Sequence, residues 1–528
     1  MAKHWWEGGC VYQVYPRSFQ DSNGDGIGDL RGIATRLDYL AGLGIDAIWL
    51  SPVYPSPMAD FGYDIANYCD IHPLFGTLDD FDTLIAAVHQ RGLKLLMDFV
   101  PNHSSDQHPW FLESRSSRQS SKRDWYIWRD PGPDGGPPNN WTSDFGGSAW
   151  EYDPPSGQYY YHAFLKEQPD LNWRNPEVRA AMFDVMRFWL ERGVDGFRID
   201  VLWHIVKAPA FPDNPLNPDY HPSMGEKFKV LQRHSTDQPE AQEIIREMRT
   251  IADSYDGGDE RVLIGEIFLP LPRLMNYYGS ERELGVHLPF NFQLIESDWN
   301  AGAIGQFIRA YETALPAHGW PNWVIGNHDS RRIAAKVGEA QARVAAMLLL
   351  TLRGTPTLYQ GDEIGIGAVT IPSGQIKDPR ELREPGLGLG RDPARTPMAW
   401  DASPNAGFSV AEPWLPLHAG WRARNVEAQH GDAGSMLHLY QRLLQLRRGH
   451  PALSVGECFN VQVAGDILSY RRHQGQEELL VMLNLSHTVQ PLPLDIGGFR
   501  PLLSTLAGAL PNEVIQLRPD EGLLLVKG

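Results

Sequence analysis

Eight short apolar segments, separated by amphipathic or polar stretches, constrain the fold of this chain most strongly. They are nearly uninterrupted apolar runs, the pattern of parallel strands buried on both faces. We expect strands at 10–15, 47–50, 94–99, 196–199, 262–265, 288–292, 323–325 and 357–359. Apolar residues recur at helical spacing at 33–43, 78–90, 176–192, 239–253, 303–315 and 339–353. Eight such units favour an α/β fold, a closed (β/α)8 TIM barrel, over an open doubly wound sheet.

Three long insertions leave this alternation at the C-terminal ends of predicted strands, where such a barrel builds its active site. They span 103–170, 203–238 and 361–434, and the first is rich in Pro, Gly, Ser and Asn. A closing helix at 436–448 precedes short strand-like runs that indicate a C-terminal antiparallel β domain. The predicted domains are a catalytic barrel (1–102 and 171–450), an inserted subdomain after strand three (103–170) and a C-terminal β-sandwich (451–528).

Composition restricts the partners of the protein. The 528 residues carry a formal net charge of −18, which argues against nucleic acid and favours a neutral or cationic small molecule. Cys10, Cys69 and Cys458 are too few and too far apart for a disulfide framework. No signal-peptide core or membrane-spanning apolar run is visible. We therefore predict a cytoplasmic protein that does not engage membranes.

The end of the fourth predicted strand carries two charged residues, Arg198 and Asp200, in an otherwise apolar stretch. Two positions apart on a strand, they point to the same side. Burying an unpaired carboxylate costs several kcal/mol, and a neighbouring Arg offsets that cost and favours the ionised form. Asp200 is thus a candidate nucleophile, with a structural Arg–Asp pair as the alternative.

Carboxylates also follow two other predicted strands. Glu266 follows the fifth and Asp329 the seventh, while His103 and His328 lie close to the same strand ends. The C-terminal ends of barrel strands meet at one mouth, so these side chains are expected to surround one cleft. Two carboxylates facing one cleft can cleave a glycosidic bond, one as nucleophile and one as acid/base.

Four segments around these residues resemble the hallmark segments of the α-amylase superfamily, glycoside hydrolase family 13. They are 98–103, 196–204, 265–268 and 327–329. Residues 168–173, 354–365 and 391–400 are similar to segments of its oligo-1,6-glucosidase and α-glucosidase members. The resemblance covers nearly the whole chain in order.

The resemblance implies a role for each carboxylate. Asp200 would be the nucleophile, Glu266 the general acid/base and Asp329 the stabiliser of the transition state, with retention of the α configuration. Because Glu266 must be protonated to donate, we expect its pKa to be raised, while Arg198 keeps Asp200 ionised.

The resemblance also implies substrate contacts. His103 and His328 would hydrogen-bond sugar hydroxyls, Asp60 would hold a terminal hydroxyl and Tyr63 would stack on the ring. Arg395 would pair with Asp60, with Arg391 as the alternative, and this pair would make the enzyme exo-acting. The substrate-binding prediction comprises Asp60, Tyr63, His103, Phe145, Phe164, Arg198, His328 and Arg395.

Val201 and Trp203, which follow the predicted nucleophile, bear on the choice of substrate. Trp203 stands where endo-acting family members carry Lys, which favours short substrates, as does the long 203–238 loop. Val201 resembles the state common in α-1,6-acting members.

A candidate metal loop follows the first strand. Asp21, Asn23, Asp25 and Asp29 place oxygen ligands at positions 1, 3, 5 and 9, with the backbone carbonyl of Ile27 between them. The alternative is a turn rich in Asx hydrogen bonds. The resemblance supports a structural Ca²⁺, or Mg²⁺, and no organic cofactor.

We therefore predict a retaining exo-α-glucosidase that acts on disaccharides and short oligosaccharides of the maltose or isomaltose type, as a monomer or homodimer. A transglucosylase or a sucrose/maltose isomerase would use the same carboxylates. A non-catalytic, transporter-associated member is the third alternative, but such members carry a membrane helix and typically lose catalytic carboxylates.

Overall fold

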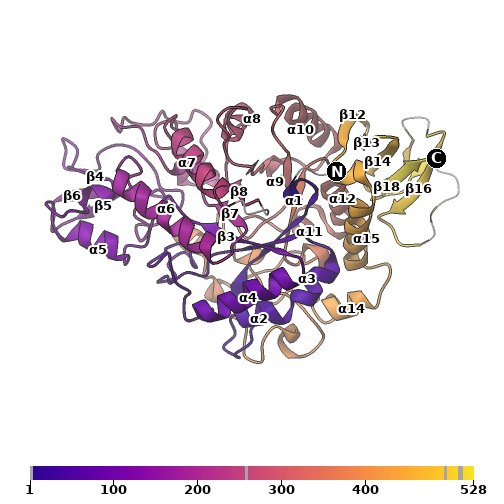
Figure 1. Cartoon of the computed structure of the whole chain (residues 1–528), viewed down its shortest axis with the longest axis horizontal. Coiled ribbons are helices and arrows are strands. Elements are labelled where there is room, and N and C mark those ends of the chain that lie inside the picture. The colour runs from indigo at the N-terminus through magenta and orange to yellow at the C-terminus, as the bar shows by residue number, and fades with distance from the viewer. Residues whose placement is uncertain (1–3, 256–259, 493–495, 509, 511–514) are drawn as a thin grey trace.

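A parallel eight-stranded sheet forms the centre of the molecule, between a small sheet at one end and a C-terminal sheet at the other (Figure 1). The computed structural model describes residues 4–255, 260–492, 496–508, 510 and 515–528. No helix in these ranges has both the length and the apolarity needed to cross a bilayer.

The central sheet is a nearly closed barrel with the strand order β10-β11-β1-β2-β3-β7-β8-β9. Between β9 and β10, the Asn322 side chain supplies the connection, because it donates to the carbonyl of Pro289 and accepts from the Asn291 N–H. The strands are β1 (Val11–Val14), β2 (Ala47–Leu50), β3 (Lys94–Phe99), β7 (Gly196–Ile199), β8 (Val262–Gly265), β9 (Leu288–Pro289), β10 (Asn322–Val324) and β11 (Thr355–Tyr359). The predicted barrel is confirmed, although the sixth strand is shorter than expected because Pro289 cannot donate to a ladder.

Helices cover the outside of the barrel. The predicted helix at 33–43 is two helices, because the backbone leaves helical geometry at Arg36, whose guanidinium lies over the Trp400 ring. The main helices are α2 (Leu30–Thr35), α3 (Leu37–Leu43), α4 (Leu78–Gln90), α6 (Pro176–Glu191), α7 (Ala241–Asp253), α10 (Ala301–Ala314), α12 (Glu339–Thr351) and α15 (Met436–Gly449).

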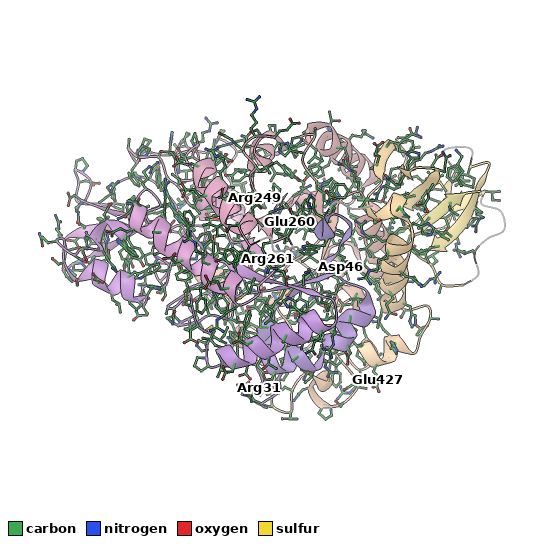
Figure 2. The ribbon with its side chains drawn as sticks, viewed as in Figure 1. Arg31, Asp46, Arg249, Glu260, Arg261 and Glu427 are labelled. Carbon is green, nitrogen blue, oxygen red and sulfur yellow. The ribbon has the colours of Figure 1, made fainter. Side chains whose placement is uncertain are left out.

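Charged residues at the N-terminal end of the barrel form structural pairs. Asp195, just before β7, pairs with His89 at 2.7 Å and Arg261 at 3.1 Å. Glu260 accepts from the Trp6 indole at 3.0 Å and so holds α1 (Trp5–Gly8) against this end. Glu260 and Arg261 are labelled in Figure 2. These groups lie at the face that supports stability in such barrels rather than catalysis.

The insertion after β3 contains its own small sheet. Strands β4 (Trp128–Arg129), β6 (Gln158–Tyr161) and β5 (Trp150–Asp153) pair in that order, preceded by α5 (Pro109–Ser116). Asn140 exchanges two hydrogen bonds with Asn214, which joins this insertion to the loop after β7. The two insertions thus lie together beside the barrel mouth.

The C-terminal region forms an antiparallel sheet that packs on barrel helices. Tyr470 hydrogen-bonds Thr351 of α12 at 2.6 Å, and an apolar cluster including Leu480 and Leu517 covers the other face. The strands run in the order β12 (Glu457–Ala464), β13 (Ile467–Gln474), β14 (Glu477–Asn484), β18 (Gly522–Lys527) and β16 (Phe499–Ser504), and β15 (Gln490–Pro491) pairs with β17 (Gln516–Leu517). The predicted domain boundaries stay predictions.

Candidate active site

Strand register brings the central charged residues together. Asp98 of β3 lies opposite Arg198 of β7, and hydrogen bonds continue one residue past the strands, from Asp200 N to Phe99 O and from Glu266 N to Ile199 O. Gly196 permits the close approach of β7 and β8, because a Cβ at this φ of 149° would lie 2.1 Å from the Val262 carbonyl. Asp200 and Glu266 consequently leave adjacent strands at the same level.

One buried guanidinium joins three carboxylates. Arg198 is 1% exposed and donates to Asp98 at 2.8 Å, Asp200 at 2.7 Å and Glu266 at 2.6 Å. Its face also lies over the Trp49 ring. Arg198 therefore fixes the positions of the predicted nucleophile and acid/base relative to each other and, buried as it is, acts beneath the pocket surface.

Burial opposes the expected effect of Arg198 on Asp200. Burial raises the pKa of Asp200 well above its ordinary value, and although Arg198 lowers it, the charges of Glu266 and Asp98 raise it further. The expected effect of Arg198, which is to lower this pKa, is present, but burial and the two neighbouring charges outweigh it, because three carboxylates share one cation.

The residue after the nucleophile has a strained backbone. Val201 has a φ of 35° and a ψ of 47°, a left-handed conformation that a β-branched residue rarely adopts. Its N–H donates to the Glu266 carboxylate at 2.9 Å. The strain therefore accompanies a hydrogen bond that orients the predicted acid/base.

Asp329 lies in a turn after β10. The Asn327 side chain accepts from the Asp329 N–H at 2.9 Å, and the carboxylate accepts from Arg395 at 2.6 Å and from Arg391 at 3.3 Å. Burial acts to raise the pKa of Asp329, but His328 and the two arginines lower it far below its usual range. Asp329 is thus a fixed negative charge, which suits stabilisation of a cationic transition state.

The partner of Asp60 is Arg391, not Arg395. Arg391 donates to Asp60 at 2.6 Å and also to Asp378 at 2.7 Å, whereas Arg395 is fully buried against Asp329 and the His328 carbonyl. The predicted Asp60–Arg395 pair is therefore wrong. Spacing along the chain could not decide between two arginines four residues apart.

Tyr63 and the two histidines form a connected network. The Tyr63 hydroxyl lies 2.7 Å from His328 Nε2, and the two rings stack with centroids 5.4 Å apart. His103 Nε2 lies 3.1 Å from Gln168 Nε2, and Gln168 also donates to Asp60. Burial lowers the pKa of His103 to about 4 and that of His328 to about 3, so both are neutral at pH 7. His328 is fully buried and supports Tyr63 and Asp329 from behind, while sugar contacts by either histidine stay a prediction.

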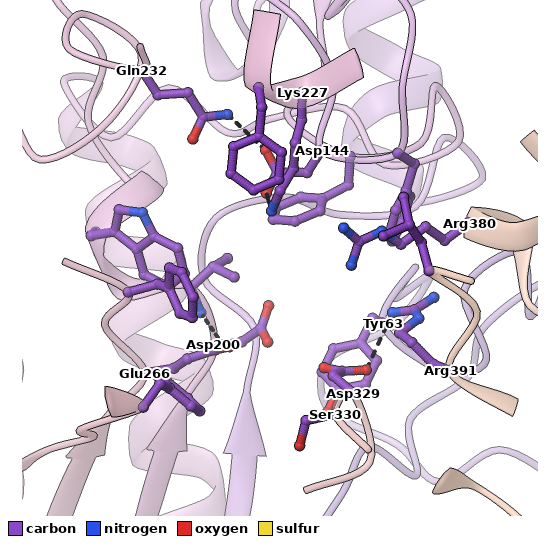
Figure 3. A pocket seen from close by; sticks show the side chains of 18 of the residues that line it. Tyr63, Asp144, Asp200, Lys227, Gln232, Glu266, Asp329, Ser330, Arg380 and Arg391 are labelled. Carbon is purple, nitrogen blue, oxygen red and sulfur yellow. Dashed lines mark hydrogen bonds and ion pairs between the residues drawn. The ribbon is translucent and has the colours of Figure 1, made fainter. Parts of the chain in front are cut away.

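A pocket of about 800 Å³ unites these groups. Asp200 and Glu266 lie on one side and Asp329 with Arg391 on the other, below Asp144 and Lys227 (Figure 3). The residues that line this pocket include Asp60, Tyr63, His103, Phe145, Phe164, Gln168, Asp200, Val201, Trp203, Lys227, Gln232, Glu266, Phe268, Phe292, Glu296, Asp329 and Arg391. Its size and its apolar lining with convergent carboxylates suit a small polar ligand.

Sequence reasoning missed the roles of several of these residues. Asp98 had a signal, since it is the one charged residue in the apolar run 95–100 and lies opposite Arg198 in the sheet. Asp378 had none, and Gln168 stood out only as the start of the 168–173 segment, because each meets its partner through folding of an insertion. The 203–238 loop supplies Lys227 and Gln232, which both contact Asp144.

The candidate metal loop is held by backbone hydrogen bonds. Asp21 accepts from the N–H groups of Asn23 and Gly24, Asn23 accepts from Asp25, and Asp25 accepts from Ile27. Asp29 accepts from the Gly32 N–H at 2.7 Å as the cap of α2. Within the described part of the chain, no three His, Cys, Asp or Glu side chains form a group that could hold a metal ion. The oxygen atoms of this loop are ligands that Ca²⁺ prefers. The carboxylates of Asp21, Asp25 and Asp29, however, do not converge on one point.

Comparison with known proteins decides the family. Residues 13–456 match the profile of the family described as "Alpha amylase, catalytic domain". The chain belongs to this family. The matched range includes the strand ends that carry Asp200, Glu266 and Asp329.

The chain is similar over most of its length to individual glucosidases and to a glucosyl transfer enzyme. The chain is 42% identical to a probable alpha-glucosidase of Rhizobium meliloti (strain 1021), covering 95% of this chain and 93% of the relative. It is 41% identical to an oligo-1,6-glucosidase of Parageobacillus thermoglucosidasius, over 92% and 91% of the two chains. The alpha-glucosyl transfer enzyme XgtA superposes with a TM-score of 0.93, at 39% identity and full coverage of both chains.

Proposed function

We propose that this protein is a retaining exo-α-glucosidase that removes the terminal non-reducing glucosyl unit of disaccharides and short oligosaccharides. The observation that carries the proposal is the position of Asp200, Glu266 and Asp329 around one pocket that also contains the Asp60–Arg391 pair. Alpha-glucosidase and oligo-1,6-glucosidase relatives at about 40% identity support this substrate class.

The geometry supports a two-step reaction. Asp200 attacks the anomeric carbon while the protonated Glu266 gives its proton to the departing oxygen, which forms a glucosyl ester. Water then attacks the same carbon, Glu266 takes its proton, and the ester bond breaks back to the Asp200 carboxylate. Asp329 stabilises the positive charge that develops on the sugar in both steps.

The Asp60–Arg391 pair supports exo action. Both side chains are buried, and Arg391 lies across the pocket from Asp200, over the Phe145 ring and paired with Asp378 (Figure 3). A terminal sugar can place a hydroxyl on Asp60, but an internal sugar would have to extend through this ion pair. We therefore propose release of single glucose units.

Transfer to a sugar hydroxyl, or isomerisation, is the second candidate. It is supported by the structural likeness to XgtA and by the trehalulose synthase MutB, which superposes with a TM-score of 0.91 at 37% identity, with full coverage of both chains. The same three carboxylates would serve, with a sugar replacing water in the second step.

A product time course distinguishes the two candidates. Maltose, isomaltose, sucrose and trehalose are supplied at low and high concentration, and glucose is resolved from new saccharides. Free glucose as the main product supports the glucosidase, and a preference for isomaltose would support the Val201 prediction. New disaccharides with little glucose would instead establish a transferase or isomerase.

The negative charge of Glu266 beside Asp200 predicts a shifted pH profile. Because the charge of Glu266 helps to raise the pKa of Asp200, Glu266→Gln should lower that pKa. Glycosylation needs ionised Asp200, so the acidic limb of kcat/KM should move to lower pH in the variant. The substrate is 4-nitrophenyl α-glucoside, whose leaving group needs no proton. An unchanged or higher limb would contradict this effect of the Glu266 charge on Asp200.

We also propose that the loop at residues 21–29 binds Ca²⁺, or Mg²⁺, as a structural ion, with Asp21, Asn23, Asp25, Ile27 and Asp29 as ligands. Support comes from the oxygen atoms at alternating positions. EDTA should then lower Tm by a few °C, and added Ca²⁺ should restore it, since a ligand of the folded state stabilises it. Asp25→Ala should abolish this response, and a wild-type Tm indifferent to EDTA would contradict the proposal.

We propose a cytoplasmic location and a monomer or homodimer. The location is supported by Cys10, Cys69 and Cys458, which are all free thiols. Cell fractionation and light scattering test the two statements.

A further inference from the structure

A buried glutamine inside the barrel contacts a histidine behind the pocket. Gln13, on β1, is fully buried and does not line the pocket, and its Nε2 lies 2.8 Å from Nδ1 of the equally buried His328. The other ring nitrogen of His328, Nε2, lies 2.7 Å from the Tyr63 hydroxyl and 3.3 Å from Oδ2 of Asp329. Tyr63 and Asp329 both line the pocket (Figure 3). The proposed function gives no role to Gln13.

The carboxylate of Asp329 decides which nitrogen of His328 carries the proton. An ionised carboxylate can only accept a hydrogen bond, and Asp329 keeps its negative charge because its pKa lies far below the usual range. A bare Nε2 would place a lone pair against this charge, whereas an Nε2–H donates to it. Since the lowered pKa of His328 leaves the ring neutral with one N–H, Nδ1 is bare and must accept.

Gln13 supplies the donor that this form of the ring needs. Its amide nitrogen donates one proton to Nδ1 of His328 and the other to the Ser51 hydroxyl at 3.1 Å. Its amide oxygen has no hydrogen-bond partner among the described residues, so this side chain acts as a donor only. An amide turned by 180° would present its oxygen to a bare nitrogen. The contacts of His328 therefore fix the orientation of Gln13 as well.

The position of this proton also sets the hydroxyl of Tyr63. Because the hydroxyl accepts from Nε2–H of His328, its own proton is free to bond the Asp98 carboxylate at 3.1 Å. Asp98 in turn shares the Arg198 guanidinium with Asp200. Hydrogen bonds with a single direction thus run from β1 to the carboxylate beside the nucleophile.

We propose that Gln13 is a positioning residue that keeps the proton of His328 on Nε2. It thereby holds Tyr63 and Asp329 in the orientation that binds the glucosyl unit. The inference rests on the proposed function and extends it to a residue outside the pocket. If the proton moved to Nδ1, a bare Nε2 would repel Asp329, and the Tyr63 hydroxyl would have to donate to it instead of to Asp98. Asp329 would then stabilise the positive charge on the sugar less well.

Gln13→Glu tests this role through the pH profile. With one extra proton, the introduced carboxyl and His328 together still keep Nε2–H, because the extra proton lies either on the carboxyl or on Nδ1. Once it is lost, the carboxylate holds the remaining ring proton at Nδ1, and Nε2 becomes bare. With 4-nitrophenyl α-glucoside, kcat/KM should therefore fall about tenfold or more as pH rises through the neutral range, as expected when an orienting partner of a functional histidine is lost. The wild type should show no such fall, since this leaving group needs no proton.

The groups around His328 do not account for such a limb in the wild type. The charged and titratable ones are Asp329, Tyr15, Tyr63, Arg198, Arg391 and Arg395. Burial and the three arginines lower the pKa of His328 to about 3, although Asp329 raises it. The ring therefore stays neutral across the wild-type profile, and a new limb in the variant reports the introduced carboxyl.

Two further variants separate positioning from damage to the fold. Gln13→Met removes the donor without adding a charge and should lower kcat/KM about tenfold at every pH. Gln341→Glu makes the matched change at a buried glutamine of α12, which donates to Asp520 and accepts from Trp299. It should leave the shape of the profile unchanged, whatever its effect on Tm. A Gln13→Glu profile parallel to that of the wild type or of Gln13→Met would overturn the inference.

A second measurement does not depend on activity. In protein with isotope-labelled histidine, nitrogen NMR identifies His328 by the signal that disappears in His328→Asn. Its Nε2 should be protonated in the wild type and its Nδ1 should not. A proton on Nδ1 would overturn the inference even if catalysis is as proposed. If the wild-type protein cleaves no α-glucoside, the proposed function itself fails, while the position of the proton is still measured.

Discussion

Replacing Asp200 with Asn should lower turnover of the preferred disaccharide by about 10⁴-fold or more, because the amide cannot form the glucosyl ester. The fold should persist, since Asn keeps the shape of the side chain and removes one of three carboxylates that share Arg198. Steady-state kinetics measure the loss, and circular dichroism with Tm measures the fold.

Glu266→Gln is the matched comparison. It should lower turnover of a disaccharide strongly, but it should retain much of the first step with 4-nitrophenyl α-glucoside, whose departure needs no acid. Asp200→Asn should lose activity on both substrates to the same degree. Substantial turnover by a folded Asp200→Asn enzyme, or equal losses on both substrates for Glu266→Gln, would contradict the assigned roles.

Replacing Arg391 with Met should lower kcat/KM by about 10²-fold or more. Arg391 holds Asp60 and Asp378 together, and its charge counters the effect of burial, which raises the pKa of Asp60. Breaking such a buried pair costs about 3–5 kcal/mol, because the remaining charges stay buried without a partner. The variant should therefore lose both terminal-sugar binding and stability.

Arg31→Met is the control for removing an arginine. Arg31 pairs with Asp80 at 2.6 Å on the surface, where its side chain is 73% exposed, and such solvent-screened pairs contribute little to stability. Arg391→Lys keeps a charge near Asp60 and should retain more activity than Arg391→Met. If a folded Arg391→Met enzyme kept wild-type kcat/KM, the role of the Asp60–Arg391 pair would be wrong.

Periodicity predicted the barrel because each buried strand must be apolar throughout. The predicted bounds of 94–99 and 196–199 match β3 and β7, and the carboxylates were found because charges at the ends of such strands are unusual. The 288–292 strand was less well predicted, since side-chain hydrogen bonds of Asn322 replace part of the ladder there.

Contacts made by the insertions could not be predicted in the same way. Arg391 meets Asp60 across 331 positions of the chain, and no local pattern distinguishes it from Arg395. The pKa of Asp200 also depends on how Asp98 and Glu266 surround Arg198, which requires the register of three strands. Residue types thus revealed the chemistry, while electrostatic balance required the structure.

The most direct test of the account is to trap the glucosyl-enzyme. A fluorinated α-glucosyl fluoride that slows the second step is incubated with the protein, which is then digested and analysed by peptide mass spectrometry. The account predicts one sugar unit on the peptide that contains Asp200. A label on the peptide of Glu266 or Asp329, or turnover without any covalent label, would contradict it.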